Sequence, residues 1–241
     1  MDINSILNGS LSLVFVIIST IVGIIIISRY FQYRVKTILY MGFAIILIAC
    51  PWWSSTVSFL KALITGGSGL TDTQYLILGN IAIPGFHILF TAALTELKFE
   101  NKKRILMAIV IIIAIVWETL LFIFSSNEYL QETQLGILQG ITDVEYRGFL
   151  QIGLTLTIFY ILFVGILISR ESIRSDQAII KLKGKFLLTS FILFTIGSIA
   201  DSQIPLDFIT LPIIRFILIF SSICFYFGFI LPKWLENLLI K

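Results

Sequence analysis

Long apolar stretches, separated by short polar turns, occupy most of the chain. Crossing the hydrocarbon core of a bilayer takes about 20 residues of helix, and an open strand there would leave backbone groups unpaired. The predicted spans are residues 11–28, 37–60, 75–95, 105–125, 148–169, 186–202 and 208–231. We therefore expect an all-α integral membrane protein, a single domain over residues 1–241 folded as a seven-transmembrane helix bundle.

Two segments outside the predicted spans have patterns of their own. Residues 126–147 are polar and acidic, with apolar residues spaced for one interfacial helix. Residues 233–241, after Pro232, alternate apolar and polar side chains at near-helical spacing and include Trp234. This tail is expected to form a short interfacial amphipathic helix along the inner leaflet.

Basic residues are distributed unevenly between the two sides of the predicted bundle. Of 17 lysines and arginines, 14 lie in the tail and in the turns after the first, third and fifth spans. Lys61 and Arg147 lie on the opposite side, and Arg215 lies inside the last span. Because cytoplasmic loops are enriched in Lys and Arg, we expect the N-terminus outside and the C-terminus in the cytoplasm of a multi-pass cell-membrane protein.

Composition excludes several classes of function. Hydrophobic residues make up 58% of the chain and charged residues 13%, against about 25% charged residues in a typical soluble domain. Seven spans leave no separate domain for catalysis or for binding nucleic acid, so we expect no enzyme activity. Cys50 and Cys224 lie in apolar runs and predict neither a disulfide framework nor a metal site. No cofactor is expected.

Ionisable residues inside spans are costly, and each is a functional hypothesis by default. Glu118 lies in the fourth predicted span, Asp201 in the sixth and Arg215 in the seventh. A buried Arg215 needs an anionic partner, either Asp201 across a short turn or Glu118 across the bundle. The pair could serve as a structural salt bridge or face a water-filled outer cavity.

The third predicted span carries a stripe of polar residues. Asn80, Pro84, His87, Thr91 and Thr95 follow one another at spacings of four, three, four and four residues, which places them on one helix face. A single histidine cannot complete a zinc site without other donors. The imidazole is then either hydrogen-bonded to another helix, or in contact with a ligand or sensing pH.

Polar residues in the outer halves of several spans predict a pocket for a small ligand. Pro51 predicts a kink in the second span, next to an outer half rich in tryptophan and serine. The candidate ligand-binding residues are Trp52, Ser55, Asn80, His87, Glu118, Gln151, Asp201 and Arg215.

About half of the chain resembles the seven-transmembrane N-terminal sensor region of archaeal and bacterial histidine kinases. The resemblance rests on Trp52 and Trp53, on Gly79, Pro84 and Phe90 in the third span, and on the basic turn 102–104. The sequence departs from that family after Pro232, where no coiled linker, phosphorylatable histidine or ATP-binding region follows. The resemblance implies a sensing role whose signal passes to a separate cytoplasmic protein.

Three functions fit these patterns. The first is a receptor-like sensor that binds a small ligand or a partner segment from the outer side and signals through its basic loops. The alternatives are a small-solute or ion transporter or channel, and a non-catalytic subunit of a membrane complex. The expected partners are membrane lipids, an outer ligand and a cytoplasmic signalling protein, without nucleic acid. A pocket sealed below His87 favours the receptor, whereas a continuous polar path favours transport.

Overall fold

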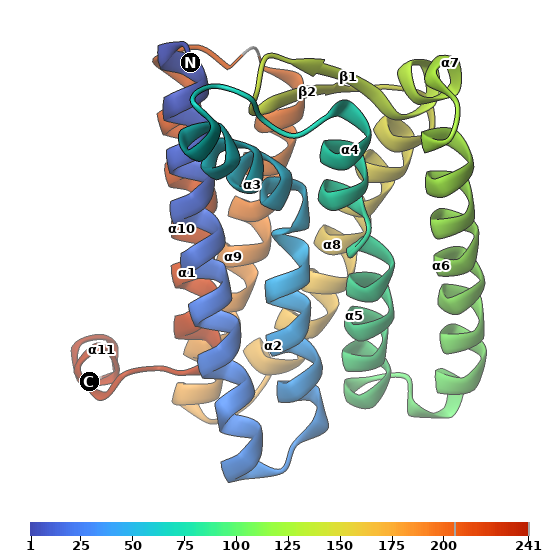
Figure 1. Ribbon diagram of the computed structural model, residues 1–241. Coiled ribbons are helices and arrows are strands. Elements are labelled where there is room, and N and C mark those ends of the chain that lie inside the picture. The colour runs from blue at the N-terminus through green and yellow to red at the C-terminus, as the bar shows by residue number, and fades with distance from the viewer. Residues whose placement is uncertain (205, 241) are drawn as a thin grey trace.

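The computed structural model describes residues 1–204 and 206–240, and most of them are helical (Figure 1). In this part of the chain, five helical segments are long and apolar enough to cross a membrane. They are α1 (Ile3–Tyr33), Asp72–Leu97, Glu100–Ser125, α8 (Gly148–Ile173) and α10 (Thr210–Phe229). A bent pair, α2 (Lys36–Ile48) and α3 (Cys50–Thr65), forms a sixth candidate. These segments confirm the multi-pass membrane class, while the count of seven spans stays a prediction.

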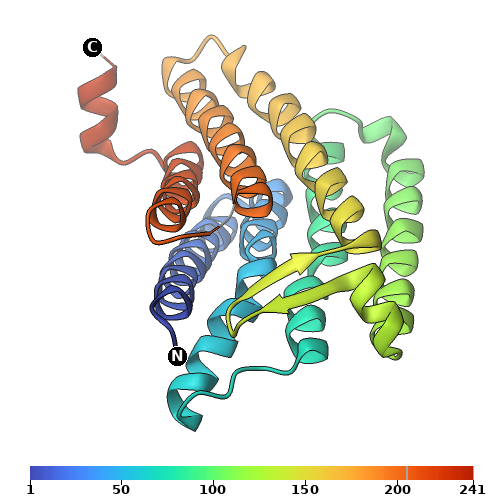
Figure 2. The same cartoon turned by 90° about the horizontal axis from the view of Figure 1, so that it is seen from above.

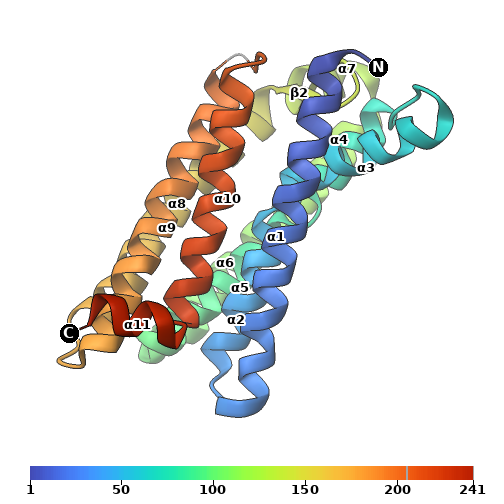
Figure 3. The ribbon, with the colours of Figure 1, turned by 90° about the vertical axis from the view of Figure 1, so that its left-hand side faces the viewer.

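The sixth predicted span, residues 186–202, lies within α9 (Ala178–Gln203), which is not among those candidates. Lysines precede its apolar stretch and Asp201 ends it, so only the 15 residues 186–200 are free of charge. That is shorter than the roughly 20 residues that cross the hydrocarbon core. α9 nevertheless packs against both α8 and α10 (Figures 1 and 3), so it belongs to the bundle.

Two of the predicted spans are broken helices. α2 and α3 meet at a bend of 48°, with Pro51 in the first turn of α3, as the proline predicted. The segment Asp72–Leu97 divides into α4 (Asp72–Asn80) and α5 (Ile83–Leu97), with Pro84 in the first turn of α5. Proline lacks the N–H that would bond to the preceding turn and crowds its carbonyl, which favours a break. The predicted span over 75–95 therefore lies within one candidate span, Asp72–Leu97, but its helix is interrupted at residues 81–82 rather than continuous.

The helices pack side by side in a curved row, and a contact between α8 and α5 closes part of this row into a ring. Successive neighbours are α6 (Lys103–Ser125), α5, α2, α1, α10, α9 and α8, and α8 also contacts α5. The turns after α1, α5 and α8 lie at one end of the bundle (Figure 1). The short helix η1 (Glu100–Lys102) belongs to the second of these turns. The N-terminus and the turn after α9 lie at the opposite end, so the fold gathers the basic turns on one face (Figure 1).

A β-hairpin crosses the end of the bundle that holds the N-terminus (Figure 2). β1 (Gly136–Gln139) and β2 (Asp143–Tyr146) pair antiparallel, after the short helices α7 (Glu128–Leu130) and η2 (Gln131–Leu135). The turn between the strands places Gly140 at a φ of 78°, which glycine adopts without a steric penalty. The expectation of one interfacial helix in 126–147 was therefore wrong, because contacts with α1, α3 and α4 hold residues 136–146 in a hairpin.

Outer helix faces and the tail both suit a lipid environment. Large apolar side chains such as Ile112 and Ile115 on α6 are mostly exposed, as is normal for a surface that meets lipid rather than water. The tail forms α11 (Lys233–Leu239), which lies crosswise to α10 (Figure 3). Trp234 and Leu238 are exposed on it, in accord with an interfacial helix. Lys241, the last residue of the predicted tail, lies outside the described residues.

Candidate functional site

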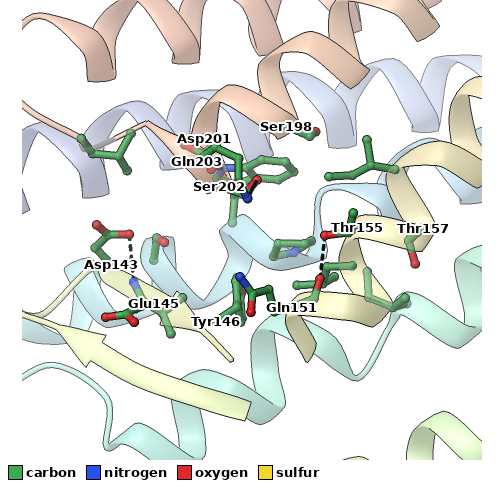
Figure 4. A pocket seen from close by; sticks show the side chains of 18 of the residues that line it. Asp143, Glu145, Tyr146, Gln151, Thr155, Thr157, Ser198, Asp201, Ser202 and Gln203 are labelled. Atoms are coloured by element: carbon green, nitrogen blue, oxygen red, sulfur yellow. Dashed lines mark hydrogen bonds between the residues drawn. The ribbon is translucent and has the colours of Figure 1, made fainter. Parts of the chain in front are cut away.

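A cavity of about 570 Å³ lies at the hairpin end of the bundle. Its walls come from α3, α8, α9 and the hairpin (Figure 4). This volume is typical of small-ligand pockets, which measure about 300–1,000 Å³. Exposed polar side chains line its opening: Gln139, Glu145, Gln151, Thr155, Ser202 and Gln203.

Arg215 anchors a buried polar part of the cavity wall. Its side chain is 2% exposed, and its Nη1 donates a hydrogen bond to Asp201 Oδ1 at 2.5 Å. The other oxygen of Asp201 accepts a hydrogen bond from Trp52 Nε1 at 3.0 Å. The guanidinium carbon of Arg215 lies 5.8 Å from the Trp52 ring centre, within reach of a cation–π interaction. Of the two partners predicted for Arg215, the structure selects Asp201.

Asn8 completes this cluster, and sequence reasoning missed it. Its Oδ1 accepts a hydrogen bond from Arg215 Nη2 at 2.7 Å, and its Nδ2 donates to the Thr142 carbonyl at 2.9 Å. Ser5, Asn8 and Ser12 recur every three or four residues on α1 and are all buried. That spacing is a detectable signal of a polar helix face, although residue 8 precedes the predicted span 11–28.

The hairpin turn is held by buried hydrogen bonds to three helices. Besides the contact with Asn8, the Thr142 carbonyl accepts a hydrogen bond from the Tyr75 hydroxyl of α4 at 2.9 Å. The Ile141 carbonyl accepts one from Ser58 Oγ of α3 at 2.6 Å. Backbone groups of a loop that is buried need such partners, and here they fix the hairpin as a wall of the cavity.

Two acidic residues of β2 face the cavity and were not predicted as site residues. Glu145 forms an ion pair with Arg147 at 3.0 Å. Asp143 accepts a hydrogen bond from the backbone N–H of Val144 at 2.8 Å. Burial raises the pKa of the Asp143 carboxyl, and the negative charge of Asp201 adds to that effect. Both residues line the cavity because this segment folds as a hairpin. The sequence predicted a helix here, so the two residues were not identified.

Aromatic rings close the cavity on the side away from the hairpin. Phe86 lines the cavity and stacks on Phe90, with ring centres 5.1 Å apart. Phe90 contacts Phe191, which in turn lies edge-on to Phe225 at 4.9 Å. The space left among these rings and α2 is about 10 Å³, no more than one water molecule needs. We call Phe86, Phe90, Phe191 and Phe225 the aromatic floor.

Five of the eight predicted ligand-binding residues line this cavity. They are Trp52, Ser55, Gln151, Asp201 and Arg215. Ser55 shares a hydrogen bond of 2.6 Å with the Tyr75 hydroxyl, which orients it within the wall. The cavity therefore unites residues of α3, α8, α9 and α10 that are far apart in the sequence.

Asn80, His87 and Glu118 do not line the cavity. Asn80 is fully buried at the end of α4 and donates a hydrogen bond to the Leu76 carbonyl at 2.8 Å. Glu118 lies on α6 and makes no ion pair with any residue that the structure describes. The interruption of the third span at residues 81–82 separates Asn80 from the rest of its predicted stripe.

His87 lies behind the cavity wall rather than in it. Its Nε2 is 3.2 Å from the hydroxyl of Thr157, a residue that does line the cavity. Further along α5, the Thr91 and Thr95 hydroxyls donate to the backbone carbonyls of their own helix, as such residues often do. This arrangement agrees with a histidine hydrogen-bonded to a neighbouring helix.

Neither a metal centre nor a relative accounts for the cavity. Within residues 1–204 and 206–240, no three His, Cys, Asp or Glu side chains are grouped so that they could hold a metal ion. The buried thiols of Cys50 and Cys224 are free. Comparison with protein families, with curated proteins and with solved structures finds no match to this chain.

Proposed function

We propose that this protein is a seven-transmembrane, receptor-like sensor that binds a small ligand in the cavity beneath the hairpin. The observation that carries the proposal is the aromatic floor, which ends the cavity partway through the bundle. A receptor needs such a closed pocket, whereas a transporter needs a polar route between the two sides. The opening, lined by uncharged polar side chains of α8 and α9, would admit the ligand from the hairpin side.

The proposed orientation places the N-terminus and hairpin outside the cell and the basic turns in the cytoplasm. It is supported by the positive-inside rule and by the clustering of the basic turns at one end of the fold (Figure 1). These turns would pass the signal to a separate cytoplasmic protein. Cysteines placed at Ser68 or Asn127 should be labelled by an impermeant reagent outside intact cells, and a cysteine at Asp176 only after permeabilisation.

Thiol labelling separates the receptor from a transporter. In a chain with Cys50→Ala and Cys224→Ala, a cysteine at Thr155 samples the cavity opening, and cysteines at Thr91 and Thr95 sample the level of the aromatic floor and below it. A small water-soluble thiol reagent should modify Thr155→Cys from outside and spare Thr91→Cys and Thr95→Cys from both sides.

The other possible labelling results would each favour one of the alternative functions. Reaction at Thr95→Cys from the outer solution would show a water-filled route through the bundle, and the transporter or channel would replace the receptor. Protection of Thr155→Cys from both sides would mean that the cavity is closed to solvent, which would leave a non-catalytic subunit of a membrane complex as the better explanation. An expression control by size-exclusion chromatography confirms that each variant is folded.

A further inference from the structure

The charges around the cavity do not cancel. Five acidic or basic side chains line it, and four of them form two ion pairs: Arg147 with Glu145, and Arg215 with Asp201. Asp143 is the fifth. Among the residues that the structure describes, no lysine or arginine lies within ion-pair distance of its carboxylate. The cavity therefore carries one carboxylate in excess.

The surroundings of Asp143 leave its charge poorly compensated. Its side chain accepts a hydrogen bond from the backbone N–H of Val144, the next residue on β2. Asp201 and Arg215 face the same cavity from α9 and α10, but their charges are already paired with each other. A half-buried carboxylate without a cationic partner is costly, and a ligand that brings a positive charge would offset that cost.

A second group in the wall also lacks a partner. Ser198 lies one turn before Asp201 on α9, lines the cavity and is 6% exposed (Figure 4). In the described part of the chain, nothing hydrogen-bonds to its hydroxyl oxygen. Buried hydroxyls in folded proteins are nearly always hydrogen-bonded. Its hydroxyl is therefore an unpaired polar group in the cavity wall, whose missing partner a bound molecule would supply.

Apolar side chains also contribute to the cavity wall. The side chains of Ile83, Leu154, Ile158, Ile161 and Phe194 line the cavity together with the Trp52 ring. An apolar wall with few polar contacts at defined positions is typical of a site for a small organic molecule. A fully hydrated inorganic cation would leave this surface unused.

We propose that the cavity selects an organic cation, an ammonium group on an apolar body, with Asp143 as the counter-ion and the Ser198 hydroxyl as a hydrogen-bonding partner. The inference rests on the proposed function, because it names the ligand class of the same cavity. An anionic ligand is disfavoured because the charged side chains of the lining carry one carboxylate in excess. Both terminal nitrogens of Arg215 are already bound to Asp201 and Asn8, and only its Nε lacks a partner among the described residues.

Charge-selective labelling tests this inference without knowledge of the natural ligand. Ser198→Cys is placed in the background that lacks Cys50 and Cys224. Its reaction rate is measured with a cationic reagent, 2-(trimethylammonium)ethyl methanethiosulfonate, and with an anionic one, 2-sulfonatoethyl methanethiosulfonate. The ratio of the two rates is divided by the same ratio at the exposed Ser68→Cys, which corrects for intrinsic reactivity.

The expected corrected ratio favours the cation by about tenfold, because a low-dielectric cleft with one uncompensated charge concentrates ions of opposite sign. Asp143→Asn should bring the ratio close to one. Glu132→Gln is the matched control: it removes the same charge at the same end of the fold, but Glu132 is exposed and does not line the cavity. It should leave the ratio unchanged.

The outcomes distinguish this inference from the proposed function. If both reagents modify Ser198→Cys but the corrected ratio is one, favours the anion, or is insensitive to Asp143→Asn, the cavity is open and its selectivity for cations is refuted. If neither reagent, nor the small neutral methyl methanethiosulfonate, modifies Ser198→Cys, no solvent-accessible cavity exists. The proposed function itself then fails.

Discussion

The substitution Arg215→Met tests the energetic role of the polar cluster. Methionine retains an apolar stem but removes the guanidinium, which donates to both Asp201 and Asn8. Asp201 would keep only the hydrogen bond from Trp52 Nε1, and Asn8 Oδ1 would keep only the hydrogen bond of 3.3 Å from Ser12 Oγ. The substitution therefore leaves a carboxylate and an amide oxygen without their main partner.

The expected loss follows from the burial of the pair. Removing one partner of a buried ion pair costs about 3–5 kcal/mol. Losing one of the two hydrogen bonds to Asn8 Oδ1, which keeps the bond from Ser12 Oγ, costs about 0.5–1.5 kcal/mol. The Asp201 side chain is 18% exposed, so water can recover part of its solvation, and the two figures do not simply add. We expect a loss of about 3–5 kcal/mol, which is at least about a hundredfold in the folding equilibrium.

Unfolding in mixed micelles of dodecyl maltoside and SDS measures this loss. The double variant Arg215→Met with Asp201→Asn should recover most of it, because no unpaired charge remains. Lys98→Met is the matched control: it breaks an exposed ion pair with Glu171, which contributes little to stability. Equal stability of Arg215→Met and the unchanged chain, or a double variant less stable than the single one, would refute the reasoning.

Two further predictions concern the hairpin and the helix packing. Because burial raises the pKa of Asp143, its ionised form destabilises the fold at neutral pH. Asp143→Asn should therefore raise the unfolding midpoint at pH 7.5. This gain should fade as the pH falls below 3.8, the ordinary pKa of the carboxyl, because the carboxyl is then protonated in both states; a gain independent of pH would contradict this explanation. Gly165→Ala would place a Cβ 2.3 Å from a ring atom of the aromatic floor, and overpacking of this kind costs about 1–3 kcal/mol. Gly85→Ala is its control, since the nearest atom there is the end of a leucine side chain at 3.1 Å; equal stability of the two variants would show that the floor is loosely packed.

The apolar pattern predicted the membrane class because hydrophobic length is a local property of the sequence. It also predicted a carboxylate partner for Arg215 and named Asp201 as one of two candidates, which a turn of a few residues brings together with Arg215. Pattern reasoning failed where the result depended on distant contacts. Residues 136–146 form strands because Ser58, Tyr75 and Asn8 bind the hairpin turn, and no local signal identifies those partners.

The sequence predicted the kinds of residue that line the candidate site better than it predicted which individual residues do so. Polar residues in the outer halves of α3, α8, α9 and α10 do gather around one cavity. Asn80 and His87 were grouped with them because a continuous third helix was assumed. The break before Pro84 and the bond from His87 to Thr157 place both residues outside the cavity lining. Depth in a membrane can be estimated from sequence, but the direction of a side chain around a bent helix cannot.

The contacts of Asn8 have a consequence for the order in which the chain is made. Its two partners, Thr142 and Arg215, follow it by 134 and 207 residues. Synthesis proceeds from the N-terminus, so α1 enters the bilayer long before either partner exists. The cluster, and with it this wall of the cavity, can assemble only after α10 has been inserted. A nascent chain halted before Arg215 would hold the Asp201 carboxylate in the membrane without its cationic partner, a signal by which quality control recognises an unfinished protein.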